Sequence, residues 1–500
     1  MFEYMTPEQA GISSENVLNF VQTLEKYRFM THSIMMAKGN GIFAECHYAP
    51  FDASFEHRMY SVSKSFVAVA VGLAKTQGLI RLDDRIVDYF PEYKNGHTDD
   101  LFEETTIRDM LTMQSNVASY VPWWGKYDDR IESYYENRSS KIPGTMFWYD
   151  SVGAYLLGCI VEKVTGRTFL EYLKENILLD MGFSKESHTL FSPEGYTLSD
   201  SGVICTAKDL LIFARFLMDC GEYNGKQYVD RDFMKEAITK QADNDVDGSF
   251  APYKTSGYGY LIWTLPDEGF ALLGMGDQLA ICDTKHDLIF VITSDNQSDT
   301  ATSRAIIFHE LYRTIIDEMA DAPLAENPDA YAQLQEHFKN CKLIYQHGNK
   351  SAGIAAQVNH KRYELSKNPM GMEYFTLHLE EEGGVLEYGK DGTVKRLPFG
   401  LCENKMGFFP ESKRNSNVSA KMVDGQYRCA ASAAWVTESK FVIKSQVIDT
   451  YLGCVNFYLE FQDDRATLFC KKSGQYLLDE YNGYSIGHHK ANEKGESEDE

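Results

Sequence analysis

The sequence lacks the long apolar run that a membrane-spanning helix needs, since no stretch approaches about eighteen consecutive apolar residues. Its first residues, Met1 to Glu8, contain neither a basic segment nor an apolar core, so we expect no signal peptide and a cytoplasmic protein. Positive charge is also scarce, because 49 Lys and Arg residues face 73 Asp and Glu residues and the formal net charge is −24. This balance argues against nucleic acid or an anionic membrane as the main partner.

Sequence signals for metals and nucleotides are missing as well. The chain contains no Cys-x-x-Cys pair, no His-Glu-x-x-His and no glycine-rich phosphate loop, so we expect neither a metal nor a cofactor. The ten cysteines are scattered, and several lie in apolar segments, as Cys159 does. They are typical of buried, reduced thiols in a cytoplasmic protein.

The bulk composition is that of a folded protein. With 500 residues the chain is long enough for two or three domains and a substantial core. Hydrophobic residues make up 43% and charged residues 24%, values that are close to those of ordinary soluble proteins and argue against global disorder.

The stretch with the most chemical information runs from His57 to Ala74, and it begins polar and becomes almost wholly apolar. This pattern predicts a buried helix that starts near Ser61 and ends before Gly78. Ser61 and Lys64 are three residues apart, so their side chains share one face of such a helix. A serine becomes a nucleophile when a base takes its proton, and a lysine that burial deprives of solvation can be that base. The N–H groups at the helix N-terminus would lie beside Ser61, where they could hold an oxyanion.

The same two residues also have an ordinary structural interpretation. Serine is a common helix cap, and lysine is common on the solvated faces of helices. However, Ser61 and Lys64 form the only Ser-x-x-Lys pair in the chain, and Lys64 lies where an apolar helix begins. The pattern by itself leaves both interpretations open.

The order of the expected elements indicates two domains. The first domain is expected to be an α+β domain over residues 1–320. The pattern predicts an amphipathic helix over 8–27, strands over 33–37 and 41–45, helices in the middle, and four short strand-like apolar runs between 257 and 293. Its antiparallel sheet would be completed by strands from both ends of the domain. Residues 321–340 are expected to form a linker with a helix, and residues 341–487 an all-β, barrel-like domain. Residues 488–500, with five acidic residues among the last eight, are expected to be a disordered tail.

Residues 114–147 have no clear period, and they are rich in aromatic and polar residues. A long irregular segment of this kind suits either the wall of an apolar binding site or ordinary packing. The aromatic residues in and next to it include Trp123, Trp124, Tyr134, Tyr135 and Trp148.

Several short motifs follow one another along residues 5–320. They are Tyr60-Ser61-Val62-Ser63-Lys64, Gly78-Leu79-Ile80-Arg81-Leu82-Asp83, Thr106-Ile107-Arg108-Asp109-Met110-Leu111, Tyr149-Asp150-Ser151, Cys205-Thr206-Ala207-Lys208-Asp209-Leu210 and Tyr223-Asn224-Gly225-Lys226. In this order they resemble the penicillin-binding-protein and serine β-lactamase superfamily, especially its class C-like and family VIII esterase branch. The resemblance implies a helix-flanked antiparallel sheet with Ser61 as the acylated nucleophile and Lys64 as its proton acceptor.

The second motif of this superfamily is Tyr-x-Asn or Tyr-x-Ser, and it fits this sequence at Tyr93, Tyr135 and Tyr149. We assign it to Tyr149, because only there does a Leu-Leu-Gly helix follow directly, and we keep Tyr135 as the alternative. By this resemblance Tyr149 protonates the leaving group and then activates the deacylating water. Ser151 and Trp148 are expected to bind substrate beside it.

The third motif departs from the superfamily, which usually has Lys-Thr-Gly or His-x-Gly on the strand that lines the site. The matching strand here is 272–278, and it has neither Lys nor His in register. Gly274, Met275 and Gly276 leave room for a backbone N–H to complete the oxyanion hole. Penicillins and D-Ala-D-Ala peptides carry a carboxylate, so the missing cation favours an ester or a small amide as substrate.

We therefore expect a serine hydrolase that forms an acyl-enzyme on Ser61 and cleaves a small-molecule ester or amide, with acyl transfer to an alcohol or amine as a variant. One alternative is a β-lactamase or a D-Ala-D-Ala peptidase-like penicillin-binding enzyme. The other is an inactive, hydrolase-like binding protein. The sequence leaves open the substrate, the role of the C-terminal domain and the oligomeric state, and a homo-oligomer is compatible with it.

Overall fold

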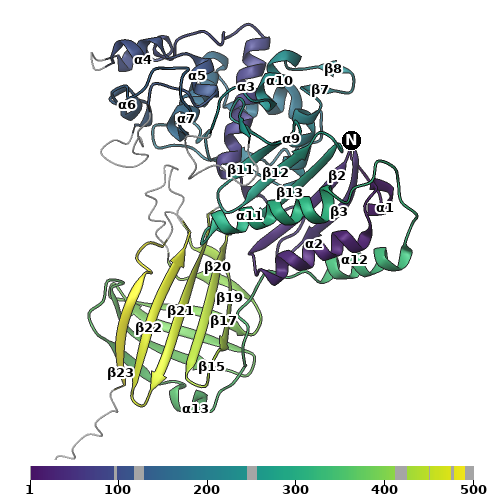
Figure 1. Cartoon of the computed structure of the whole chain (residues 1–500). Helices are drawn as coiled ribbons and strands as arrows, with labels where there is room; N and C mark the ends of the chain where they lie inside the picture. Colours follow the sequence, from purple (N-terminus) through teal and green to yellow (C-terminus); the bar gives the residue numbers. More distant parts are fainter. Residues whose placement is uncertain are drawn as a thin grey trace, which may run out of the picture. The chain divides into compact units, whose positions relative to one another are not determined.

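Strands from both ends of the first 320 residues pair in one sheet, as the sequence predicts (Figure 1). The computed structural model describes residues 2–94, 98–117, 129–244, 256–411, 425–449, 451–474 and 478–489. The chain divides into two compact units, of which the first ends at Leu343 and the second begins at Ile344.

The sheet of the first unit has the strand order β1-β3-β2-β13-β12-β11-β10-β9, and only the outer pair β1–β3 is parallel. Its strands are β1 (Glu3–Tyr4), β2 (Thr31–Lys38), β3 (Gly41–His47), β9 (Gly257–Tyr258), β10 (Trp263–Thr264), β11 (Phe270–Gly274), β12 (Gln278–Asp283) and β13 (Leu288–Ser294). The pairing of β2 with β13 joins the two ends of the domain, with Met35 opposite Val291. Both strands are almost wholly buried and have an apolar central run, Ile34 to Ala37 in β2 and Leu288 to Ile292 in β13.

Helices and small strands surround this sheet. The helices are α1 (Pro7–Ala10), α2 (Ser14–Lys26), α3 (Ser63–Thr76), α4 (Asp100–Glu104), α5 (Ile107–Leu111), α6 (Arg130–Tyr135), α7 (Ser151–Thr165), α8 (Phe169–Leu173), α9 (Ala207–Met218), α10 (Arg231–Ile238), α11 (Thr300–Leu311) and α12 (Pro328–Asn340). The small strands are β4 (His57–Arg58), β5 (His188–Thr189), β6 (Val203–Cys205), β7 (Glu222–Tyr223) and β8 (Lys226–Gln227).

The prediction of one helix over residues 8–27 is wrong, because two helices occupy this stretch. Gly11 ends α1 in a left-handed conformation with a φ of +89°, which is open to glycine at little cost. Ser13 then caps α2 by accepting a hydrogen bond from the backbone N–H of Asn16. A glycine in the left-handed region and a serine cap are thus sufficient to divide an amphipathic pattern.

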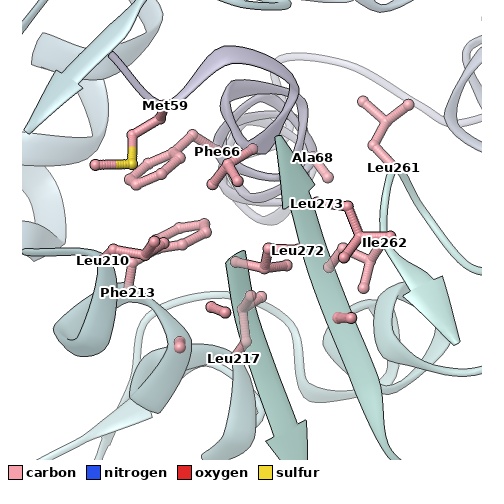
Figure 2. Packing of buried hydrophobic residues seen from close by; sticks show 14 of the residues in the cluster. Met59, Phe66, Ala68, Leu210, Phe213, Leu217, Leu261, Ile262, Leu272 and Leu273 are labelled. Atoms are coloured by element: carbon pink, nitrogen blue, oxygen red, sulfur yellow. The ribbon is translucent and has the colours of Figure 1, made fainter. Parts of the chain in front are cut away.

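Helix α3 is the centre of the first unit, because every residue from Ser63 to Ala74 is buried. It packs against α7 and α8, and its Phe66 ring stacks on Phe213 of α9 with 3.7 Å between the ring centroids. Figure 2 shows these two rings in an apolar cluster with Leu272 of β11. Full burial of a side chain of this size contributes about 1.5–3 kcal/mol, so the cluster holds α3 firmly beside the sheet.

Helix α12 lies within residues 321–340 and belongs to the first unit. It packs against α2 and β3, and its Leu334 and Phe338 are buried. No helix in the described parts of the chain is both long enough and apolar enough to cross a membrane.

The second unit is a closed β-barrel, which confirms the predicted C-terminal all-β fold. Its elements are α13 (Ala355–Val358), β14 (Arg362–Leu365), β15 (Met372–Leu379), β16 (Gly383–Lys390), β17 (Thr393–Leu401), β18 (Lys405–Phe409), β19 (Tyr427–Trp435), β20 (Lys440–Ile448), β21 (Leu452–Gln462), β22 (Arg465–Ser473) and β23 (Gly483–His489). The strands follow the order β17-β16-β15-β14-β23-β22-β21-β20-β19, and a parallel pair of β17 with β19 closes the ring. Strand β18 is added on β19, while residues 490–500 of the expected tail lie outside the described residues.

Candidate active site

Ser61 lies in a turn of 3₁₀ helix, η1 (Tyr60–Val62), that leads directly into α3. The backbone of the preceding Tyr60 has a φ of +47°, a left-handed conformation that is strained for a residue with a side chain. The chain before the turn is fixed, because Met59 donates its N–H to the carbonyl of Val203 at 2.8 Å and Arg58 pairs with Ile204. The surrounding strands therefore hold a strained turn in place just before a buried helix.

The Lys64 side chain is directed back toward Ser61. Its Nζ donates a hydrogen bond to Ser61 Oγ at 3.1 Å and another to the carbonyl oxygen of Asp200 at 3.0 Å. A carboxylate oxygen of Asp200 lies 3.8 Å from the same nitrogen, and the Lys64 side chain is only 1% exposed. A buried amine in contact with a serine hydroxyl can accept the proton of that hydroxyl.

Asp200 is a member of this site that the sequence analysis missed. Burial raises the pKa of its carboxyl group, although the charges of Lys64, Arg130 and Arg58 act in the opposite direction. The segment around it is anchored, since Ser199 Oγ donates to the carbonyl of Tyr155 at 3.1 Å. Asp200 lies in an irregular segment between β5 and β6 and belongs to no motif, so only the fold reveals its place beside Lys64.

Tyr149 also lies beside Lys64, with 5.2 Å between Lys64 Nζ and the centroid of the Tyr149 ring. The ring stacks on Trp263 of β10 at a centroid distance of 5.7 Å, and Trp263 in turn meets Tyr258 edge to face. Tyr149 immediately precedes the Asp150 cap of α7, whose side chain accepts a hydrogen bond from Gly153. We define Ser61, Lys64, Tyr149 and Asp200 as the Ser61 site. Trp263 is a further neighbour that the sequence analysis missed.

The two other tyrosines that fit the second motif have their hydroxyls engaged elsewhere. Tyr135 is fully buried in α6 and donates to the carbonyl of Ile86 at 3.3 Å. The Tyr93 hydroxyl donates to Asp129 at 2.6 Å, and Asn95, the last residue of its motif, lies outside the described residues. Of the three tyrosines, Tyr149 is the one whose ring contacts Lys64.

Ser151 and Trp148 flank Tyr149 along the chain. Ser151 is the first residue of α7 and is half-buried, while Trp148 is half-buried and donates its backbone N–H to the carbonyl of Met113 at 2.8 Å. Their contribution to substrate binding stays a prediction. Trp123 and Trp124 of the aromatic segment lie outside the described residues.

The strand assigned to the third motif, β11, packs against η1. A Cβ atom at Gly274 would lie 2.4 Å from the carbonyl oxygen of Met59, so only glycine allows the strand to come this close to the turn that carries Ser61. Met275 and Gly276 follow in the turn toward β12, where Gly276 has a φ of +71°. This segment therefore lies close to η1, and its contribution to an oxyanion hole stays a prediction.

A cation does reach this strand, but it comes from α11. Arg304 donates to the carbonyl of Gly274 at 2.8 Å and to a carboxylate oxygen of Asp277 at 3.1 Å. Asp277 is fully buried and also accepts hydrogen bonds from Asn296 and Ser303. Since Asp277 offsets the charge of Arg304, this arrangement mainly fixes the turn after β11. The sequence analysis missed both residues.

Comparisons with known proteins agree with this geometry. The family model described as Beta-lactamase matches residues 19–310, more than half of the chain. The 6-aminohexanoate-dimer hydrolase of Paenarthrobacter ureafaciens is 24% identical over 268 residues, which cover 49% of this chain and 67% of that protein. Penicillin-binding protein 4* of Bacillus subtilis (strain 168) is 20% identical over 353 residues, which cover 59% and 75%.

The fold is also found among solved structures. EstCE1, a hydrolase with promiscuous acyltransferase activity, superposes with a TM-score of 0.50 at 13% identity. The match covers 60% of this chain and 99% of that chain. At this level of identity the likeness shows the fold of the first unit.

Proposed function

The chain belongs to the β-lactamase family of serine hydrolases, and we propose that it cleaves a carboxylic ester or amide through an acyl-enzyme on Ser61. The observation that carries the proposal is the 3.1 Å hydrogen bond between Lys64 Nζ and Ser61 Oγ, made by a lysine that is 1% exposed. A solvated lysine on a helix surface would have neither this partner nor this burial.

In the acylation step, Lys64 takes the proton of Ser61 as the serine oxygen attacks the substrate carbonyl carbon. The ammonium group that results lies next to the Asp200 carboxylate, which offsets its charge. Backbone N–H groups of the Ser61 turn and of the Gly274–Gly276 segment stabilise the oxyanion.

In the next steps, Tyr149 supplies a proton to the leaving alcohol or amine as the bond from the carbonyl carbon to that group breaks. Tyr149 then takes a proton from a water molecule, whose oxygen attacks the acyl carbon. The bond from this carbon to Ser61 Oγ breaks, the acid leaves, and the Lys64 ammonium returns its proton to Ser61 Oγ. If an alcohol or amine replaces this water, the same steps transfer the acyl group.

The charges near β11 support a substrate without a carboxylate at this position. Arg304 is the cation that contacts this strand, and its charge is paired with the buried Asp277. An ester or a neutral amide is compatible with such a site, because neither requires a free cation. As to the bond that is cleaved, the relative named 6-aminohexanoate-dimer hydrolase supports the amide branch, although a dimer of 6-aminohexanoate itself carries a free carboxylate.

The direct test is the intact mass of the full-length protein after reaction with a fluorophosphonate probe. We expect one covalent adduct on the wild type and none on Ser61→Ala, because only a serine activated by a base reacts quickly with this probe. Ser65→Ala is the matched control, since Ser65 lies four residues further along and donates to the carbonyl of Leu261 at 2.9 Å. It should keep the adduct. A folded wild type without an adduct would overturn the proposal in favour of a binding protein.

The penicillin-binding relative favours a second candidate, acylation of Ser61 by penicillin. A fluorescent penicillin distinguishes the two. Stable labelling that is lost in Ser61→Ala would move the assignment to a penicillin-binding enzyme, whereas hydrolysis of simple esters without penicillin labelling supports the first candidate.

A further inference from the structure

A second group of chemically reactive side chains lies in the first unit, outside the Ser61 site. It consists of Glu25 near the end of α2, Cys46 on β3, His337 on α12 and Cys341 just after α12. A carboxylate oxygen of Glu25 lies 3.1 Å from His337 Nε2 and 3.7 Å from Cys341 Sγ. The donor atoms of Glu25, His337 and Cys341 all lie within 4.8 Å of one another. We refer to the four residues as the His337 cluster.

Cys46 is the fourth member of the cluster because of its place on β3. It points to the same face of the strand as Tyr48, whose hydroxyl donates to Glu25 Oε1 at 3.2 Å. Cys46 is 1% exposed, and the neighbouring Cys341 thiol, burial and the Glu25 carboxylate raise the pKa of its thiol. The three donor atoms that lie within 4.8 Å of one another belong to Glu25, His337 and Cys341, so we treat Cys46 as a neighbour of these donors and not as one of them.

Two of the separations between donor atoms are close to those around a tetrahedral zinc ion. Zinc binds oxygen and nitrogen at about 2.0 Å and sulfur at about 2.3 Å, so tetrahedral ligands lie about 3.3 Å apart for an O–N pair and about 3.5 Å apart for an O–S pair. The corresponding distances here are 3.1 Å and 3.7 Å.

The chain segments that supply the donors are also suited to a metal. His337 and Cys341 are four residues apart at the end of α12, a spacing that places both side chains on one helix face. Glu25 approaches from α2, against which α12 packs.

We propose that Glu25, His337 and Cys341 form a zinc site that holds the end of α12 against α2. An imidazole, a carboxylate and a thiol are all zinc donors, and together they supply three of the four positions of a tetrahedral zinc ion. The thiol ligand disfavours magnesium and calcium, which prefer oxygen. The proposal departs from the metal-free protein expected from the sequence, because the ligands come from α2 and from the end of α12, which are far apart in the chain.

The cluster has a definite structural position at the end of the first unit. Cys341 accepts a hydrogen bond from the backbone N–H of Ala49 at 3.0 Å, and Leu343 donates back to the carbonyl of Ala49 at 2.9 Å. A zinc ion would therefore stabilise the segment that follows α12. None of its ligands belongs to the Ser61 site, so the zinc proposal and the hydrolase proposal can fail independently.

The test measures metal content and zinc affinity in the purified full-length protein and in His337→Ala and Cys341→Ser. We expect about one zinc per chain in the wild type and an affinity at least about tenfold lower in each variant, by competition with a chromophoric chelator. Cobalt in place of zinc should give thiolate-to-cobalt charge-transfer absorption in the wild type, which weakens in Cys341→Ser. Circular dichroism checks that each variant is folded, and the partly exposed His337 is the safer substitution if Cys341→Ser does not fold.

Two controls match the variants in chemistry but lie outside the cluster. His286 pairs with Asp283 at 2.8 Å, and Cys282 is a buried free thiol on β12. His286→Ala and Cys282→Ser should bind zinc as the wild type does. The proposal is overturned if the folded wild type binds no zinc at micromolar free metal, if all variants bind it equally, or if Cys46 and Cys341 form a disulfide in the isolated protein.

Discussion

The Ser61 site and the His337 cluster both bring charged groups together in the first unit, but they differ in burial and in charge balance. The Lys64 and Asp200 side chains are 1% and 2% exposed and compensate each other. The Glu25 and His337 side chains are 33% and 26% exposed, and they share their space with two thiols. The amine and the carboxyl group of the Ser61 site have no access to water, so each depends on polar partners within the protein, whereas the partly exposed His337 cluster can also take partners from solvent.

This difference predicts unequal responses to mutation. Removing one partner of a buried pair leaves an uncompensated charge, which typically costs 3–5 kcal/mol, whereas a partly exposed pair contributes about 0–1 kcal/mol. Substitutions at the Ser61 site should therefore change both chemistry and stability. Those at the His337 cluster should act mainly through metal binding.

The largest effect is expected for Lys64→Gln. Loss of the base should lower kcat/KM for a simple ester by about a thousand-fold or more, because the serine hydroxyl is a weak nucleophile without it. Lys174→Gln is the control, since Lys174 is also buried and donates to the carbonyls of Lys185 and Ser187, both at 2.8 Å. Near-normal hydrolysis by Lys64→Gln would show that burial of this lysine serves stability alone.

The next largest effect is expected for Tyr149→Phe. Loss of a general acid and base typically lowers the rate by a factor of about 10² to 10⁴, so kcat should fall within this range while the fold persists. Tyr135→Phe removes a hydroxyl that bonds only to a backbone carbonyl in the described structure, and it should leave kcat unchanged. The reverse result would assign the second motif to Tyr135.

A smaller effect, on stability rather than on chemistry, is expected from removing the metal. Ligand present at 100 times its Kd stabilises a protein by about 2.7 kcal/mol, which corresponds to a Tm shift of several degrees in a domain of this size. A chelator should therefore lower the Tm of the wild type measured by calorimetry, while the Tm of His337→Ala should not respond. Equal responses of the two proteins would contradict the zinc proposal.

The smallest effect is expected for Glu162, a partly buried carboxyl group outside both sites. Thr197 donates two hydrogen bonds to the Glu162 carboxyl group, from its backbone N–H and from its hydroxyl. Burial raises the pKa of Glu162 to about 7. Between the ordinary value of about 4.3 and this value the folded protein holds a proton that the unfolded chain has released, so stability falls as pH rises through this window.

Glu162→Gln keeps the side chain neutral and should remove this loss. Its Tm should equal that of the wild type near pH 4.5 and exceed it by a few degrees near pH 8, as followed by thermal melts across pH. Parallel melting curves for the two proteins at all pH values would show that Glu162 ionises as an ordinary surface carboxylate does.

Within the Ser61 site, some residues could be predicted from the sequence and others could not. Ser61 and Lys64 are three residues apart, so helical geometry alone predicts that their side chains meet, and the apolar run after them predicts burial. Tyr149 was assigned from the helix that follows it, and the structure places its ring next to Lys64. For Asp200 and Trp263 the sequence carries no such local signal.

The strands and the first two helices of the first unit illustrate a further limit of prediction from sequence. The alternation and length of apolar runs predict β2, β3 and the β11–β13 meander, because these patterns are local. The break between α1 and α2 was missed, since it depends on one glycine in the left-handed region. The hydrophobic periodicity of about twenty residues does not reveal the backbone angle of a single residue.

The sequence by itself therefore determined the fold class, the barrel-like C-terminal part and the Ser–Lys pair, because each depends on periodicity or on residues within one turn of a helix. Only the tertiary structure placed Asp200 beside Lys64, Arg304 beside the Gly274 strand, and His337 and Cys341 beside Glu25. These contacts join residues that are 30 to 316 positions apart in the chain. Such contacts form when buried polar groups find partners as the elements pack, a condition that no local pattern in the chain encodes.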